Sequence, residues 1–190
     1  DPAAYAIEGR PLPEKPETNV SFDLLSYLPF TFTSDKWQTG LRASMQLSYN
    51  HSVFYYADED AYKQGIFYTE PRLYFYRFQK TAYRDLQTRW GITLDLRRTS
   101  TPFEEEQLGD INTIKAGIYL PGIIRNQGIR LQAALQTQQT DRYLFGNKVS
   151  FPRGYQPANG ENLRKVSADY LLPLLYPDLN LTFLAYIKRI

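Results

Sequence analysis

Two carboxylates, Glu70 and Asp95, fall on polar positions of separate predicted strands and have the residue types of a glycosidase acid–base pair. Arg72 lies two positions after Glu70, and Arg97 lies two positions after Asp95. Because strand positions i and i+2 share one face of a sheet, this spacing favours ion pairing over proton transfer. We therefore expect structural ion pairs here, no catalytic site, and a protein that is not an enzyme.

Residue types that bind metals or phosphates are sparse. His51 is the only histidine and cysteine is absent, which excludes multi-histidine and cysteine-based metal sites. The acidic runs at 58–60 and 104–106 offer oxygen ligands of the kind calcium prefers, but both fall in predicted loops, where solvated charge is the better interpretation. Gly91 and Gly117 indicate bends rather than a phosphate cradle. No metal or cofactor is predicted.

A third group combines a cationic turn with a carboxylate. Arg153, Gly154 and Tyr155 lie in a long predicted loop, and Asp169 follows on the polar face of the next predicted strand. A guanidinium matches a carboxylate with a planar fork of donors, and Gly154 lets the backbone turn sharply. We predict that Arg153 pairs with Asp169 and pins the loop; the alternative is a surface loop with a solvated arginine.

Composition narrows the class of protein. Hydrophobic residues make up 43% of the 190 residues, yet the mean hydropathy is −0.48, and no stretch approaches the roughly 18 apolar residues of a spanning helix. The 16 Tyr and 11 Phe suit strands and surfaces where an apolar region meets water. A net charge of +2 is too balanced to indicate a nucleic-acid partner.

The dominant pattern is strict alternation of apolar and polar residues, which predicts an all-β chain with eight long antiparallel strands. No segment has the periodicity of an amphipathic helix. The predicted strands cover approximately 20–33, 41–50, 68–76, 89–97, 113–120, 129–138, 165–172 and 179–188. In the third of these, Pro71 removes a backbone donor, so we expect a bulge or kink there.

The connections alternate between short and long, as in an up-and-down barrel with turns at one rim and loops at the other. The long ones are predicted at 51–64, 99–110 and 140–160, the short ones near 34–36, 80–85, 121–127 and 176–178. Residues 1–19 contain four prolines and no periodicity, which indicates an extended tether or a frayed terminus. The barrel segment is assigned to 20–190.

Alternation does not say whether the apolar face meets a protein core or lipid. Strands of this length suit a bilayer, which requires about 9–11 tilted residues, and aromatic residues gather near strand ends. Charges on the polar face in mid-strand suit a wet barrel interior. The charges predicted to face that lumen are Arg42, Glu70, Arg72, Arg89, Asp95, Arg97, Lys115, Arg130 and Lys165. The fold predicted is therefore a transmembrane β-barrel, with a soluble β-sandwich or ligand-binding barrel as the alternative.

The arginine turn and the strand after it resemble a motif of the bacterial surface-antigen superfamily, the BamA-type barrels and related secretion transporters. Its pattern is Arg-Gly-aromatic on a lumenal loop, then a strand with Ser-x-acid-aromatic-x-x-Pro. Here Arg153, Gly154 and Tyr155 match the turn, and Ser167, Asp169, Tyr170 and Pro173 match the strand. In that family the arginine pairs with the acid, which implies the pair Arg153–Asp169. The end of the chain is also similar to a Bacteroidetes-type subgroup.

The resemblance implies a location in the outer membrane of a Gram-negative bacterium and a role in membrane insertion or translocation of protein. Its partners would be membrane lipid, unfolded outer-membrane or secreted polypeptides, and periplasmic accessory domains. Barrels of the family have about sixteen strands, so the chain would be part of a larger barrel. The residues alone leave a passive outer-membrane channel or a surface adhesin as an alternative.

Overall fold

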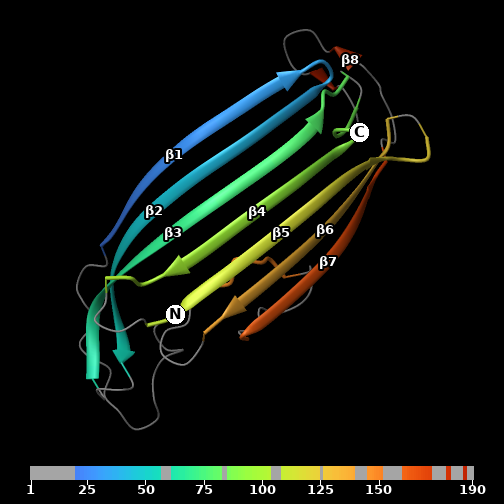
Figure 1. Cartoon of the computed structure of the whole chain (residues 1–190). Helices are drawn as coiled ribbons and strands as arrows, with labels where there is room; N and C mark the ends of the chain where they lie inside the picture. Colours follow the sequence, from blue (N-terminus) through green and yellow to red (C-terminus); the bar gives the residue numbers. More distant parts are fainter. Residues whose placement is uncertain are drawn as a thin grey trace.

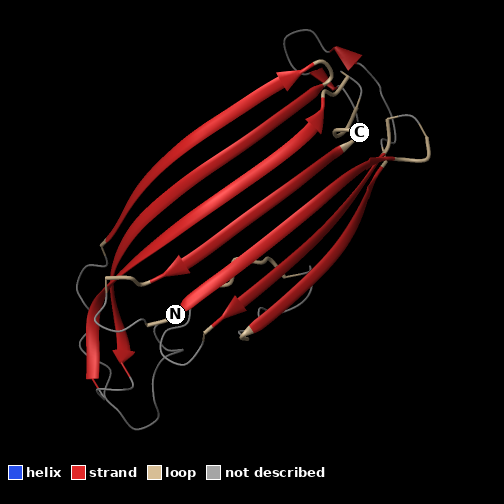
Figure 2. Cartoon of the chain, viewed as in Figure 1, coloured by secondary structure: helices blue, strands red, loops and turns tan. Residues whose placement is uncertain are grey.

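The computed structural model describes residues 20–56, 61–82, 85–103, 108–124, 126–139, 145–151, 160–172, 179–180 and 186–187. For 52–56, 61–63, 179–180 and 186–187 only the backbone is described. The predicted tether at 1–19 and the turn at 153–155 therefore lie outside the described residues. Every element in the described part of the chain is a strand (Figure 2). No helix there is long and apolar enough to cross a membrane.

Seven strands form one antiparallel sheet in the order of the sequence, which confirms the all-β, up-and-down prediction (Figure 1). Each inner strand of the sheet pairs with the strands before and after it in the chain. The sheet appears as one curved layer in which β1 and β7 form the two edges and do not close on each other. The strands are β1 (Ser21–Ser34), β2 (Trp37–Tyr56), β3 (Ala61–Gln79), β4 (Gly91–Ser100), β5 (Asp110–Pro121), β6 (Gly128–Gln138) and β7 (Asn162–Leu171).

The prediction of an eighth strand in the same sheet is wrong. In place of one strand over 179–188, the structure has two short strands, β8 (Leu179–Asn180) and β9 (Tyr186–Ile187), which pair with each other. Residues 181–185 lie outside the described part of the chain. Period-two alternation shows which side chains share a face, but it does not show where the chain reverses, so two short strands fit it as well as one.

The long connection predicted at 51–64 is also wrong. β2 and β3 continue as a paired hairpin to Tyr56 and Ala61, with a register shift between Asn50 and Val53. The hairpin therefore extends past the pairing with β1, which stops at Asn50. Val, Phe and Tyr at 53–56 favour extended backbone, and residues 57–60, which include the acidic run, lie outside the described residues.

Pro71 interrupts pairing without shifting the register. On one side it stands opposite Met45 in an unbroken ladder with β2. On the other side, the pairing with β4 passes from Thr69 directly to Arg72 in the same register. Gln79 lies an even number of positions after Pro71 in β3, so the backbone nitrogens of both residues point towards the same neighbouring strand. The N–H of Gln79 donates to the carbonyl of Trp90, on the β4 side, at 2.9 Å. The nitrogen of Pro71 therefore faces β4, where its missing N–H removes one ladder bond.

The register aligns the alternating apolar positions of successive strands on one face, which we call the apolar face. One row across six strands shows the pattern, and its members stand opposite one another in sequence order: Leu28, Ala43, Leu73, Leu96, Ile114 and Leu135. Large side chains on this face are exposed, among them Leu28 at 65%, Leu135 at 48% and Val166 at 84%. No second layer covers this face in the described part of the chain.

The opposite face, which we call the polar face, carries most of the charged and amide side chains of the strands and is partly covered by connecting segments. Its buried hydrophobic residues are few and cluster towards one end of the strands. Ile66 and Ile111, on β3 and β5, are 1% exposed, and Val149 from the segment 145–151 is 2% exposed. Phe145 of that segment makes an edge-to-face contact with Tyr68 of β3 at 5.8 Å between ring centroids. The small hydrophobic core therefore lies on the polar face.

Candidate functional site

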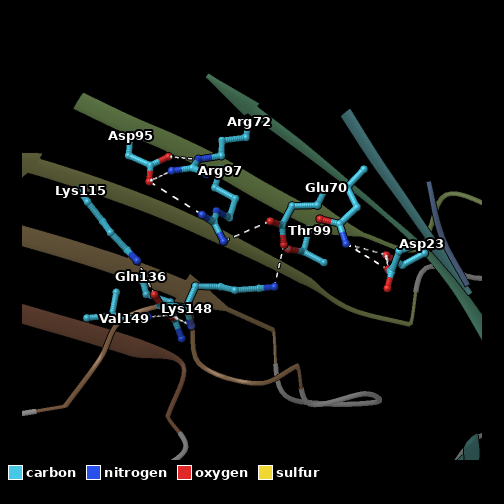
Figure 3. Close-up of polar contacts among 12 residues, drawn as sticks. Asp23, Glu70, Arg72, Asp95, Arg97, Thr99, Lys115, Gln136, Lys148 and Val149 are labelled. Carbon is cyan, nitrogen blue, oxygen red and sulfur yellow. Dashed lines mark hydrogen bonds and ion pairs between the residues drawn. The ribbon is translucent and has the colours of Figure 1, made fainter. Parts of the chain in front are cut away.

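The polar face carries an ion-pair network that begins at Asp95 of β4 (Figure 3). Arg72 of β3 binds this carboxylate with both arms of its guanidinium, Nε to Oδ1 at 2.7 Å and a terminal nitrogen to Oδ2 at 2.8 Å. Arg97, two positions along β4, lies 3.8 Å from the same Oδ2. The bidentate geometry fixes orientation as well as charge, so the ion pairing predicted for Asp95 is confirmed.

Glu70 of β3 is the second centre of this network and the more buried one, with its side chain 9% exposed. Arg97 lies 3.2 Å from its Oε1, and Lys148 lies 2.6 Å from its Oε2. The hydroxyl of Thr99 also donates to Oε2 at 3.0 Å. A buried carboxylate is costly unless it is paired and hydrogen-bonded, and here both oxygens are satisfied.

The segment 145–151 is held on the polar face by two glutamines of β6. The amide oxygen of Gln136, which is 1% exposed, accepts the backbone N–H groups of Lys148 at 2.8 Å and Val149 at 3.2 Å. Its nitrogen donates to Asn147 Oδ1 at 2.8 Å. Gln138 donates to the carbonyl of Phe145 at 3.1 Å. Side chains of the strand thus supply the partners that the backbone of an irregular buried segment requires.

Two lysines hold the same segment from its other side. Lys115 of β5 donates to the carbonyl of Lys148. Lys165 of β7 donates to Ser150, to the carbonyl at 2.9 Å and to Oγ at 3.1 Å. Together with the ion pair between Lys148 and Glu70, these contacts join the segment to four strands: β3, β5, β6 and β7.

Asp169 of β7 binds a different arginine from the one we predicted. Arg130 of β6 stands directly opposite it and approaches Oδ2 with Nε at 3.0 Å and a terminal nitrogen at 2.9 Å. Both side chains are exposed by about two-fifths, at 39% and 44%. Arg153 lies outside the described residues, so its pairing with Asp169 stays a prediction.

The other residues of the resemblance motif divide between the two faces. Ser167 shares the polar face with Asp169, whereas Tyr170 stands opposite Ile129 on the apolar face and is 49% exposed. Gly154, Tyr155 and Pro173 lie outside the described residues. The acidic runs at 58–60 and 104–106 lie outside them too. Within the described residues, no group of three or more carboxylates and histidines is placed to hold a metal ion.

Eight of the nine charges predicted to face a lumen lie on the polar face in the observed register. Arg42 of β2 is exposed, and its guanidinium lies 5.7 Å from the ring centre of Tyr27. Arg89 is the exception, because it precedes β4 and lies 3.6 Å from Asp85 in the connection after β3. The eight are Arg42, Glu70, Arg72, Asp95, Arg97, Lys115, Arg130 and Lys165.

Sequence analysis missed the residues that dock the segment: Lys148, Gln136 and Gln138. A signal for the glutamines was present, since they are long amides at alternate positions of one strand, but an amide facing water gives the same pattern. Lys148 gave no signal, because its partner Glu70 is distant in the sequence.

The network can orient and hold, but its carboxylates are poorly suited to catalysis by proton transfer. Each oxygen of Glu70 and Asp95 already binds a cation or a hydroxyl group. The site therefore fixes an irregular segment against a sheet and places several cations around a polar hollow. Comparison with known proteins adds no family to this geometry, because no family model, no curated protein and no solved structure matches the chain.

Proposed function

We propose that residues 20–190 are part of a transmembrane β-barrel of the bacterial outer membrane, of the BamA surface-antigen type, which acts in membrane insertion or translocation of polypeptides. The observation that carries the proposal is the distribution of polarity across the sheet: apolar side chains face outward uncovered, while ion pairs and a small core lie on the opposite side. The mechanism would be mechanical and non-covalent.

The imbalance between exposed and buried hydrophobic residues is large. Among the described residues, 23 large hydrophobic side chains are exposed and six hydrophobic residues are buried. Leaving a Leu, Phe or Met side chain in water instead of burying it costs about 1.5–3 kcal/mol. Apolar surface that extends over all seven strands is far larger than a soluble monomer ordinarily exposes. Lipid would cover it without any further protein layer.

Strand length and the position of rim residues support the same proposal. β4 and β7 have 10 residues, β6 has 11 and β5 has 12, against about 9–11 for a tilted strand that spans a bilayer. Trp37 and Trp90 precede the apolar stretches of β2 and β4, at the rim with the short connections. The guanidinium of Arg77 lies 5.0 Å from the ring centre of Trp37, and Trp side chains are enriched at membrane–water interfaces.

The assignment to the BamA type rests on the motif residues together with the docked segment. Segment 145–151, fixed on the polar face, leads directly into the residues Arg153, Gly154 and Tyr155. A segment anchored at Lys148 and Ser150 lies on the polar face, which in the proposed barrel would face the lumen. Ser167 and Asp169 lie on that same face in the neighbouring strand.

A cysteine scan of β6 in liposomes tests the lipid-facing assignment, and since residues 1–190 contain no cysteine, each introduced label is unique within this part of the protein. Single cysteines at 130–135 would carry an environment-sensitive fluorophore in the full-length protein. We expect emission that alternates with period two, blue-shifted at Leu131, Ala133 and Leu135 and water-like at Arg130 and Gln132. Water-like emission at all six positions, or a monomer that stays soluble without detergent, would overturn the proposal in favour of a soluble β-protein.

A passive channel is the second candidate, because the polar face lines an ion-paired hollow of the kind found in a permeable barrel. Two measurements on the full-length protein separate the candidates. An insertase accelerates the folding of a client barrel into liposomes that contain it. A passive channel leaves that rate unchanged and gives steady conductance in a planar bilayer.

A further inference from the structure

A polar hollow of about 320 Å³ opens between β4–β7 and the docked segment. Lys115 of β5 and Lys165 of β7 flank Ala134 of β6 in one row of the register, so a small side chain separates two long cationic ones. Tyr119 and Ser167 also line the hollow. The small side chain of Ala134 therefore leaves room between two side chains that carry ammonium groups.

Positive charge exceeds negative charge around this hollow. Asp95 stands opposite Lys115 in the register, but its two oxygens bind the guanidinium groups of Arg72 and Arg97. Glu70 is likewise taken up by Arg97 and Lys148. Of the charged residues, Asp95, Lys115 and Lys165 line the hollow itself, and the network around them holds five cations and two carboxylates in all. Within the described residues, neither Lys115 nor Lys165 has a carboxylate within ion-pair distance. The cations are Arg72, Arg97, Lys115, Lys148 and Lys165.

Both lysines keep donors for a ligand. An ammonium group has three N–H donors. Lys115 uses one of them on the carbonyl of Lys148, and Lys165 directs two at Ser150. The remaining donors belong to two ammonium groups on either side of one small residue, and a multivalent oxyanion can accept from both at once.

We propose that this hollow binds a small oxyanionic solute, one that carries phosphate or carboxylate groups, between Lys115 and Lys165. The site differs from the predicted pairing of Arg153 with Asp169. It does not depend on whether lipid covers the apolar face, since the side chains that would bind the solute lie on the polar face. Tyr119 and Ser167 supply further hydroxyl donors at its edge.

Titration of the full-length folded protein with inorganic pyrophosphate tests the proposal. Binding is measured at low ionic strength, by line broadening in phosphorus NMR or by calorimetry. We expect saturable binding that weakens as salt is added. Lys115→Gln and Lys165→Gln should each weaken it about tenfold, because each removes one charge-assisted contact. Lys165→Arg, which keeps the charge, should retain most of the affinity. Lys80→Gln is the matched control, since Lys80 donates to the carbonyl of Asp35 in a distant turn.

Three results would overturn the proposal. One is the absence of pyrophosphate binding at millimolar concentration in the unsubstituted protein. Another is undiminished binding in the Lys115→Gln/Lys165→Gln double variant when its circular dichroism shows an intact sheet. The third is binding of an acidic peptide such as polyglutamate without any binding of pyrophosphate, which would assign the hollow to a polypeptide. Should Lys115→Gln loosen the docked segment, the comparison of Lys165→Gln with Lys165→Arg still decides the question.

Discussion

Lys148 Nζ lies 2.6 Å from Glu70 Oε2, so the segment that leads into the predicted arginine turn is tied to β3. The lysine side chain is 26% exposed and the carboxylate 9% exposed. The contact crosses the polar face from one half of the sheet to the other. Glu70 of β3 therefore contacts the neighbouring strand β4, through Arg97 and Thr99, and the segment 145–151, through Lys148.

Replacing Lys148 with methionine should release the docked segment and leave the sheet intact. Glu70 would keep Arg97 and Thr99, so the expected loss of unfolding free energy is about 1.5–3 kcal/mol, the value of one charge-assisted hydrogen bond. Limited proteolysis would show faster cleavage within 145–151 at unchanged circular dichroism. Lys80→Met, at a surface turn, is the control. Equal cleavage of the two variants would mean that the ion pair does not hold the segment.

Gln136→Leu should be more damaging than Gln132→Leu, although both residues lie on the polar face of β6. Loss of the Gln136 amide leaves the N–H groups of Lys148 and Val149 without their acceptor. Such buried groups cost about 1–3 kcal/mol each, so we expect a loss of about 2–4 kcal/mol. The side chain of Gln132 makes no hydrogen bond in the described part of the chain. Hydrogen exchange at the amides of 148 and 149 is the direct measurement, and protection that survives in Gln136→Leu would contradict this role.

Thr99→Val and Thr113→Val form a matched pair on adjacent strands. Thr99 is fully buried and donates to Glu70 at 3.0 Å, so its loss should cost about 1.5–3 kcal/mol, as for a hydrogen bond to a charged group. Thr113 is 2% exposed, but its hydroxyl oxygen has no hydrogen-bond partner in the described structure. Thr113→Val should therefore change stability by less than about 0.5 kcal/mol. Chemical denaturation of both variants measures the two losses of unfolding free energy, and the loss for Thr99→Val should be the larger.

Asp169 has one observed partner, Arg130, and one predicted partner, Arg153. A double-mutant cycle between Arg130 and Asp169 should give a coupling of about 0.5–1 kcal/mol, since both side chains are substantially exposed. Arg153→Ala should leave the strand content unchanged and increase protease cleavage in the loop. A cycle between Arg153 and Asp169 completes the test. Zero coupling between Arg153 and Asp169, with unchanged cleavage of the loop, would show that Arg130 alone binds the Asp169 carboxylate.

The strands and their faces could be predicted because period-two alternation is a local property of the chain. Leu24 and Leu28 had to share a face whatever they met, and so did Arg72 and Glu70. The end of a strand is less determined, since it depends on whether a neighbour continues alongside. That is why β2 and β3 extend beyond the predicted loop at 51–64, and why the predicted eighth strand is two short ones.

Amino-acid order by itself determined the all-β class, the meander of neighbouring strands and the two opposed faces, with Glu70, Arg72, Asp95 and Arg97 together on the polar one. These follow from spacing of two residues and from strands that lie next to each other. Only the tertiary structure decided that Lys148 reaches Glu70, that Gln136 holds the segment 145–151, and that Arg130 binds Asp169. Such contacts depend on the register between strands and on the path of a connection, and neither is encoded in the short-range pattern of polarity.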